Sequence, residues 1–164
     1  MLKVKKLHPE AQLPTVAHPG TDLGFDLYAL EDTALPAGIP VKVRTGIAVE
    51  APEGFGFIVG DRSSMASKGV TYMGGRIDAG YRGELLICLV NVNQPAITLL
   101  TEKNASGAIT EAKLEHAGAT IHLAKGDKIA QISPFAAMTA WPIVEVDELS
   151  ETTRAAKGFG SSGR

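Results

Sequence analysis

Glycine and proline recur at short intervals along most of the chain, and this spacing is the strongest constraint on the fold. The 164 residues include 18 glycines and 9 prolines, which interrupt any long helix. The segments between them are short and rich in β-branched residues, a rhythm typical of β-sandwiches and barrels. The sequence therefore predicts an all-β domain.

Two runs give the clearest strand patterns. The run Val41–Glu50 predicts one strand with a single apolar face, made of Val41, Val43, Thr45, Ile47 and Val49. The run Leu85–Val92 is almost continuously apolar, which predicts burial by the core on one face and by another subunit on the other. Shorter strands are expected over residues 4–7, 22–30, 55–59, 97–100, 121–123, 128–133 and 141–146.

Three segments depart from this pattern. Thr101–Gly118 is polar and holds a helical patch at Thr110–Ala117, so it is expected to be an exposed excursion. Ser63–Lys68 predicts one helical turn capped by a serine. We expect a single β domain over residues 1–149, followed by a mobile tail over residues 150–164 that a ligand would order.

Composition excludes several classes of protein. A net charge of −2 gives no global basic field for nucleic acid. The single cysteine excludes a disulfide framework and suits a reducing compartment. The first ten residues lack the apolar core of a signal peptide, and no apolar run approaches ~18 residues, the length that spans a membrane. A soluble, cytoplasmic protein is expected.

The stretch from Asp61 to Glu84 holds the main candidates for chemistry. Asp78 stands at the mouth of an apolar strand and is a candidate general base that takes a proton from water. Its structural alternative is a turn aspartate bonded to its own backbone. Tyr81 is a candidate for stacking on a sugar or base, and its alternative is an aromatic that covers the core at a strand edge.

Two further segments suit phosphate. Arg62-Ser63-Ser64 at a helix start offers a guanidinium and helix amides, although a capping turn with a surface arginine is the simpler explanation of this motif alone. The tail segment Gly158–Gly163 offers unobstructed backbone amides, with Arg154 for charge and Phe159 for stacking. Its alternative is an idle, solvated terminus.

The remaining polar candidates are weaker. Asp26 and Gln131 lie within apolar strands, where a satisfied cross-strand hydrogen bond is the simplest explanation. The histidines and Cys88 show no metal-ligand spacing, and Cys88 is expected to be a buried apolar group.

Together and in this order, five blocks resemble the trimeric dUTPase family. The first is Pro19–Ala29, the second Arg62–Ala66, and the third and most specific Gly75–Gly83, which reads GRIDAGYRG. The fourth block is Gly126–Gln131 and the fifth is Arg154–Gly163. They span nearly the whole chain.

The resemblance implies a jelly-roll homotrimer whose active sites each draw on three subunits and cleave dUTP to dUMP and pyrophosphate with Mg²⁺. It implies that Asp78 orients or deprotonates the attacking water and that Asp26 acts on the metal indirectly, through water. It places Tyr81 under the deoxyribose, Arg154 on the γ-phosphate and Phe159 over uracil. The substrate contacts that it implies are Arg62, Ser63, Ser64, Gly75, Ile77, Tyr81, Gln131, Arg154, Phe159, Gly160 and Ser161.

Departures from the family pattern leave alternatives. Ser64 replaces the usual glycine, and a Ser-Ser pair is similar to dCTP deaminases. Those enzymes carry a glutamate ten residues past the aspartate, where this chain has Cys88, and an arginine where it has Ser67. Deamination at cytosine therefore lacks an evident proton shuttle. The segment between Arg62 and Asp78 is short, and Ala155-Ala156-Lys157 replaces a glycine-richer run.

Thr101–Gly118 has the character of an insertion between the third and fourth blocks. A tolerated surface loop is the simpler interpretation, and a protein-binding excursion is the alternative. The hypotheses are therefore a dUTP hydrolase, a nucleotide-switched regulatory binding protein on the same fold, and a deaminase or bifunctional relative.

Overall fold

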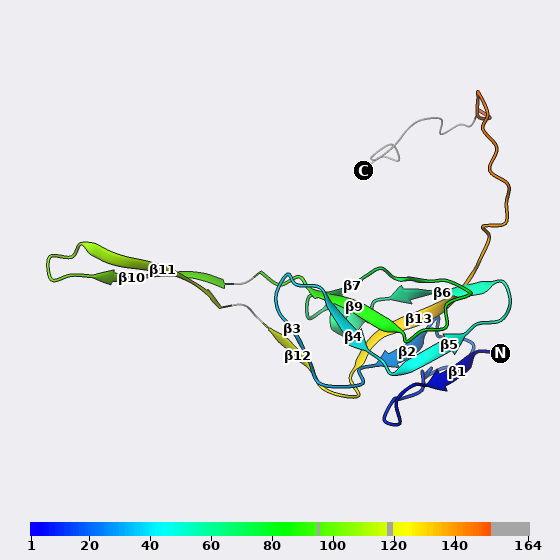
Figure 1. The fold of residues 1–164 in the computed structure, drawn as a ribbon, viewed down its shortest axis with the longest axis horizontal. Coiled ribbons are helices and arrows are strands. Elements are labelled where there is room, and N and C mark those ends of the chain that lie inside the picture. The colour runs from blue at the N-terminus through cyan, green and yellow to red at the C-terminus, as the bar shows by residue number, and fades with distance from the viewer. Residues whose placement is uncertain (95, 118–119, 152–164) are drawn as a thin grey trace.

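The structure, a computed structural model, describes residues 1–94, 96–117 and 120–151, and these residues are almost entirely β-strand and loop (Figure 1). The one short helix among these residues is α1 (Ser63–Ala66). The strands are β1 (Lys3–Lys6), β2 (Phe25–Tyr28), β3 (Thr33–Leu35), β4 (Val41–Arg44), β5 (Ile47–Glu50), β6 (Phe55–Gly60), β7 (Val70–Met73), β8 (Arg76–Ile77), β9 (Leu86–Asn91), β10 (Ala96–Lys103), β11 (Ile109–Ala117), β12 (Ile121–Leu123) and β13 (Lys128–Ala136). The predicted all-β class is confirmed.

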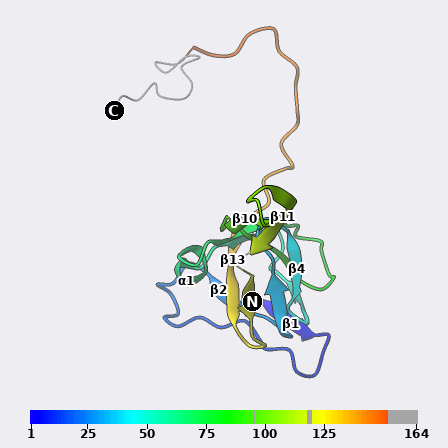
Figure 2. The ribbon, with the colours of Figure 1, turned by 90° about the vertical axis from the view of Figure 1, so that its left-hand side faces the viewer.

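Antiparallel sheets enclose the core as in a jelly roll. The larger sheet has the order β2-β13-β6-β8 and the second β4-β9-β7, while β1 pairs with β5 and β3 with β12. Viewed end-on, β2 and β13 lie on one side of the body and β4 on the other (Figure 2). Both sheets send fully buried side chains into one apolar cluster, among them Leu27, Ile129, Ile132, Val43, Ile87 and Leu89. This layering is the usual way in which two half-polar sheets bury their apolar faces.

The predicted single strand over Val41–Glu50 is wrong, because it divides at Gly46 into β4 and β5. Gly46 adopts φ +69°, and a Cβ there would stand 2.9 Å from that of Ala11. The two halves then pair in different sheets, β4 with β9 and β5 with β1. The alternation holds in β4, whereas Ile47, Ala48 and Val49 of β5 are all buried.

Strand β9 is buried on one face only within a single chain. Ile87 and Leu89 are buried in the core, while Leu86 on the opposite face is 46% exposed. Cys88, on that same face, is only partly buried, so the expectation that it is a buried apolar group is wrong within one chain. The apolar outer face remains open to the second covering that the sequence predicts.

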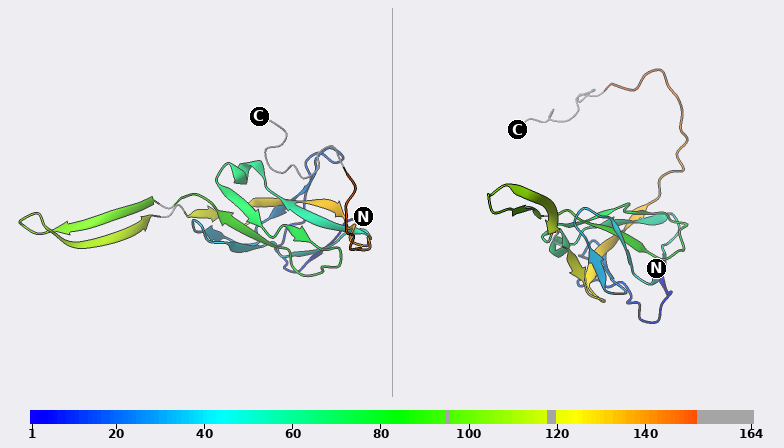
Figure 3. Two further views of the ribbon diagram at one scale, coloured as in Figure 1. Left: turned by 90° about the horizontal axis from the view of Figure 1, so that it is seen from above. Right: turned by 60° about the vertical axis from the view of Figure 1, so that its left-hand side comes forward.

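The expected helical patch at Thr110–Ala117 is wrong as well. These residues form most of β11, which pairs with β10 in a hairpin that projects away from the body (Figures 1 and 3). Asn104 closes the turn, since its Oδ1 accepts the N–H groups of Ser106 and Ala108 at 3.0 Å. Cross-strand pairing over the whole ladder therefore outweighs the helix preference of the Ala, Glu and Lys residues.

Residues 141–146 form no strand, which corrects the predicted last strand. The chain leaves the body after β13 as an extended segment, drawn in orange in Figure 1. Its apolar side chains are more than half exposed: Trp141, Ile143, Val144, Val146 and Leu149. Among the described residues, no helix has the length and apolar character needed to cross a membrane.

Candidate active site

Asp78 presents an exposed carboxylate directly after β8. The turn that follows is closed by the backbone, with Tyr81 N–H donating to the Asp78 carbonyl at 3.0 Å. The Asp78 carboxylate itself makes no hydrogen bond or ion pair with another described residue. The turn therefore leaves the side chain free, which favours the catalytic interpretation over the structural one.

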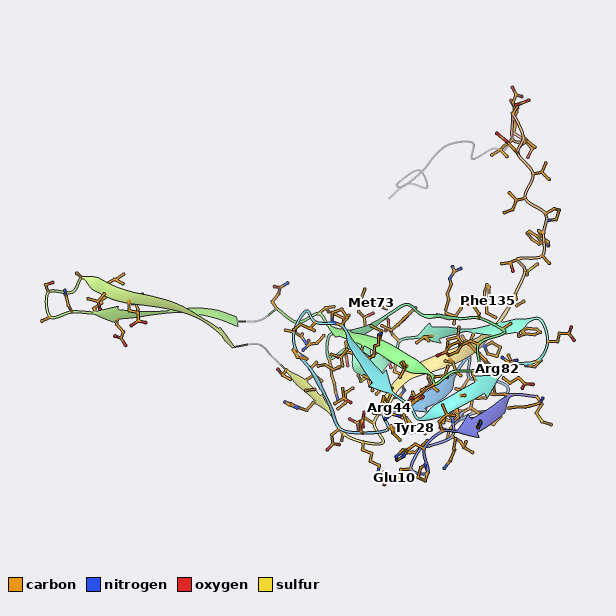
Figure 4. The ribbon with its side chains drawn as sticks, viewed as in Figure 1. Glu10, Tyr28, Arg44, Met73, Arg82 and Phe135 are labelled. Atoms are coloured by element: carbon orange, nitrogen blue, oxygen red, sulfur yellow. The ribbon has the colours of Figure 1, made fainter. Side chains whose placement is uncertain are left out.

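Asp78 and Tyr81 share an open pocket of about 190 Å³. Met73, at the end of β7 (Figure 4), and Cys88 line the same pocket. Backbone packing positions this region, because Gly56 has no Cβ and lets the Ile77 carbonyl pass: a Cβ there would stand 2.5 Å from that oxygen. Gly75 accepts a hydrogen bond from Val59 N–H at 2.7 Å.

The Tyr81 side chain is anchored through its hydroxyl. Its hydroxyl donates to the Glu84 carbonyl at 3.0 Å, and the ring is 45% exposed. The ring therefore stands at the rim of the pocket, with one surface open, and does not cover the core.

A second group of polar residues surrounds the buried carboxylate of Asp26. Its Oδ1 accepts from Arg62 Nε at 2.9 Å and from Gln131 Nε2 at 3.0 Å, and its Oδ2 pairs with Lys128 Nζ at 2.8 Å. Asp26 and Gln131 stand directly opposite each other on β2 and β13, as the simple cross-strand interpretation expects. The Lys128 ammonium also lies 5.8 Å from the centre of the Tyr28 ring, which is labelled in Figure 4.

Opposing effects set the ionisation of Asp26. Burial disfavours the charged form, but hydrogen bonds from Lys128 and Gln131 and the charge of Arg62 outweigh it, so the pKa of Asp26 lies below its usual value. The same pairing raises the pKa of Lys128. Asp26 therefore stays an anion that holds two cations at one edge of the larger sheet.

Helix α1 presents Ser63 and Ser64 at the surface beside Arg62. The expected serine cap is wrong, because Arg62 occupies the N-cap position and no side chain caps the helix. Ser64 Oγ instead accepts from Arg62 Nη1 at 3.3 Å. Both hydroxyls are exposed next to an arginine that Asp26 holds in place.

Two residues that the sequence did not single out belong to these groups. In the sequence, Lys128 has the character of an ordinary lysine at the edge of a strand. The one signal for its place in the Asp26 cluster is that it stands three residues before Gln131. Glu84 reads as a surface acid, yet its carboxylate accepts the Gly46 N–H at 2.9 Å.

The predicted site residues form two groups within one chain. Ile77, Asp78 and Tyr81 line the pocket, and Gly75 is hydrogen-bonded to Val59, which also lines it. Asp26, Arg62, Ser63, Ser64 and Gln131 form the second group. No hydrogen bond or ion pair between described residues joins the two groups. Arg154, Phe159, Gly160 and Ser161 lie outside the described residues.

Metal ligands are scarce around both groups. Within residues 1–94, 96–117 and 120–151, no cluster of three or more His, Cys, Asp or Glu side chains could hold a metal ion. Asp26 already satisfies its oxygens with Arg62, Lys128 and Gln131. These residues fit a cation that is carried by its ligand and contacted through water, not one enclosed by the protein.

Comparison with known proteins gives a consistent result. The dUTPase family model matches residues 10–106. The deoxyuridine 5'-triphosphate nucleotidohydrolase of Thermobifida fusca is 38% identical over 165 residues, covering 99% of this chain and 78% of that protein. That of Solibacter usitatus is 37% identical over 169 residues, covering 99% and 96%.

Solved structures agree with the sequence relatives. The dUTPase of Staphylococcus bacteriophage 80alpha with dUPNHPP has a TM-score of 0.80 to this chain at 32% identity, covering 100% of this chain and 99% of that one. The dUTPase of phage phi11 of S. aureus has a TM-score of 0.72 at 28% identity, covering 93% and 99%. The jelly roll, the matched family model and these relatives together show that the chain belongs to the dUTPase family.

Proposed function

We propose that this protein hydrolyses dUTP to dUMP and pyrophosphate. The observation that carries the proposal is the Asp78 carboxylate, which is exposed and unpaired among described residues beside a pocket shared with Tyr81, in a chain of the dUTPase family. A carboxylate in this state can hold a water molecule and accept its proton.

Asp78 acts on the water that attacks the α-phosphorus. The water oxygen forms a bond to phosphorus, its proton passes to the Asp78 carboxylate, and the bond from the α-phosphorus to the bridging oxygen breaks. Pyrophosphate leaves with the electron pair of that bond. Most of the rate enhancement comes from positioning and charge neutralisation, as in other phosphoryl transfers.

The nucleoside is recognised at the pocket. Tyr81 lies under the deoxyribose, and the backbone of Gly75 and Ile77 lines the path of the base. Phe159 closes over uracil, with Gly160 and Ser161 wrapping phosphate oxygens. This closure excludes water other than the nucleophile.

The phosphates are bound by the Asp26 cluster. Arg62 Nη2 makes no hydrogen bond to a described residue and is free for a phosphate oxygen, while Asp26 accepts from Nε and fixes the guanidinium. Ser63, Ser64 and Gln131 add donors, and Arg154 takes the γ-phosphate.

Mg²⁺ is the proposed cofactor, bound mainly by the triphosphate and water. When bound, it neutralises phosphate charge. Asp26 would act on it through water, because its own oxygens already accept from Arg62, Gln131 and Lys128. The structure of a mutant dUTPase from phage phi11 of S. aureus reveals the coordination of an Mg(II) ion that is described as structural.

A homotrimer with shared sites accounts for surfaces that a single chain leaves uncovered. The outer face of β9 exposes Leu86, and the extended segment after β13 exposes Trp141 and Ile143 to solvent. Exposed apolar surface of this kind indicates subunit contacts. A trimer also brings the Asp78 pocket of one subunit to the Asp26 cluster of another, which the single chain does not do.

The other hypotheses are less favoured. Cys88 lines the Asp78 pocket at the position where deaminases carry glutamate, so no carboxylate stands there to shuttle protons. A regulatory role would use the β10–β11 hairpin, which projects from the body and is the expected place for a protein partner (Figure 3). A tolerated insertion remains the simpler account of the hairpin. We place the enzyme in the cytoplasm, in keeping with its single cysteine.

A nucleotide panel tests the proposal. Purified protein with Mg²⁺ is offered dUTP, dTTP, dCTP and UTP while pyrophosphate and ammonia are both measured. We expect pyrophosphate from dUTP alone and no ammonia from dCTP. A protein that is monomeric and inert toward all four nucleotides would contradict the proposed reaction and assembly.

A further inference from the structure

The Tyr81 ring rests against a backbone that leaves no room for a side chain. A Cβ built on Gly83 would meet the Tyr81 hydroxyl, and would stand 2.7 Å from ring atom Cζ and 3.1 Å from Cε2. The ring therefore packs directly on the Gly83 backbone, and any other residue at this position must push it away. Gly80, in the same loop, has no atom within 4 Å of its built Cβ.

The hydroxyl fixes the ring in the remaining direction. It donates to the Glu84 carbonyl at 3.0 Å, which prevents the ring from swinging outward over its half-exposed surface. A ring held by packing alone at 45% exposure would keep more freedom. The Gly83 backbone thus supports the Tyr81 ring, and the hydrogen bond to the Glu84 carbonyl, called the tether below, holds its hydroxyl.

The tether is rigid because Glu84 is itself anchored. Its carboxylate accepts the Gly46 N–H at 2.9 Å and pairs with Arg44 Nε at 3.2 Å. The next residue, Leu85, donates its N–H to the Ile47 carbonyl at 2.8 Å, and its carbonyl accepts from the buried Thr45 hydroxyl at 2.7 Å. The Tyr81 ring is therefore connected through three consecutive residues to the turn between β4 and β5.

We infer that Gly83 and Glu84 are positioning residues that set the discrimination of this enzyme against ribonucleotides. The inference rests on the proposed function, in which Tyr81 lies under the sugar. Excluding a 2′-hydroxyl requires that the Tyr81 ring keep its position, because a shift of the ring by about 1 Å makes room for an oxygen atom. The packing on Gly83 and the bond to Glu84 supply that stiffness, while the ring alone supplies only the surface.

Two variants and a control test the inference by the ratio of kcat/KM for dUTP to kcat/KM for UTP. Tyr81→Phe keeps the ring and removes the tether, and we expect a roughly fivefold lower ratio, the range for one lost hydrogen bond. Gly83→Ala displaces the ring, and we expect a decrease of about tenfold or more. Gly80→Ala adds the same methyl to open space and is expected to leave the ratio unchanged.

The ratio separates a positioning role from a merely structural one. A defect in folding or loop stability lowers kcat/KM for both nucleotides together and lowers Tm, without changing their ratio. An unchanged ratio in Tyr81→Phe would overturn the inference, even if Gly83→Ala proved too unstable to assay. A parent protein that fails to hydrolyse dUTP would instead refute the proposed function and, with it, this inference.

Discussion

Replacing Asp26 by Asn tests the buried ionic cluster at the edge of the larger sheet. The change keeps the shape and one acceptor oxygen for Arg62 and Gln131, but it turns an NH₂ group toward the Lys128 ammonium, which now stands 2.8 Å from a carboxylate oxygen. The variant therefore loses a charge and gains a contact between two donors.

The expected cost follows from the exposure of the partners. Losing one partner of a fully buried ion pair costs about 3–5 kcal/mol. The Arg62 and Lys128 side chains are 24% and 38% exposed, so both can turn partly toward water and recover hydration. We expect a decrease of about 2 kcal/mol in the free energy of unfolding, or about 6 °C in Tm for a chain of this length.

The pH dependence identifies the cause. The pKa of Asp26 in the folded protein lies below its ordinary value of 3.8, so the stabilisation is complete above that pH and is lost as the pH falls through the folded value. The Tm values of parent and variant should therefore differ at pH 7 and converge in strong acid.

Differential scanning calorimetry at fixed protein concentration, without nucleotide, makes the comparison. Glu50→Gln is the matched control, because it removes an exposed carboxylate from pairs with Lys3 and Arg82 and should change Tm very little. A Tm difference for Asp26→Asn that is absent at pH 7, or equally large at acidic and neutral pH, would refute the ionic explanation.

Three further outcomes are expected. Asp78→Asn should retain the proposed trimer and nucleotide binding, but its kcat should be about 10²–10⁴-fold lower when pyrophosphate release is measured. Turnover at the parental rate would rule out Asp78 as the base. Ending the chain after Glu151 should leave Tm nearly unchanged and abolish most turnover, and an unfolded product would show that the tail supports the core. Joining the paired residues Thr98 and Glu115 through Asn-Gly should shorten the hairpin without affecting turnover. A pull-down with the parent and the shortened form would detect any partner that is lost. Reduced turnover in the shortened form would show that the hairpin contributes to catalysis.

The β character of the chain could be predicted because Gly and Pro limit the length of every segment. The breaks within a segment could not be predicted. Val41–Glu50 alternates well enough for one strand, and Gly46 reads as a weak point in it. Only the packing of Ala11 and Leu30 against Gly46 shows why the chain must turn there. In the hairpin, helix-forming residues concealed a strand, although the Asn104-to-Gly107 turn was a signal that could have been read.

The candidate site shows the same division between chemistry and arrangement. Asp78 and Gln131 could be singled out because each lies at or within an apolar strand, and Arg62 because it precedes two serines at a helix start. Their spacing in the sequence does not show which of them are in contact. Contacts such as that of Asp26 with Lys128 depend on the register of β2 against β13. Lys128 was missed for this reason, because a lysine that pairs with a buried acid has the same local sequence as one that faces water.

The separation of the two groups bears directly on assembly. A carboxylate base can hold the attacking water, but the charge that develops on a triphosphate also needs cations such as Arg62 of the Asp26 cluster. In one chain the Asp78 pocket and the Asp26 cluster share no described hydrogen bond or ion pair, and Leu86, which lines the pocket, is 46% exposed. If the proposed trimer with shared sites is correct, dissociation separates the base from the cations. Activity should then fall with dilution along with the trimer population, even while each subunit stays folded.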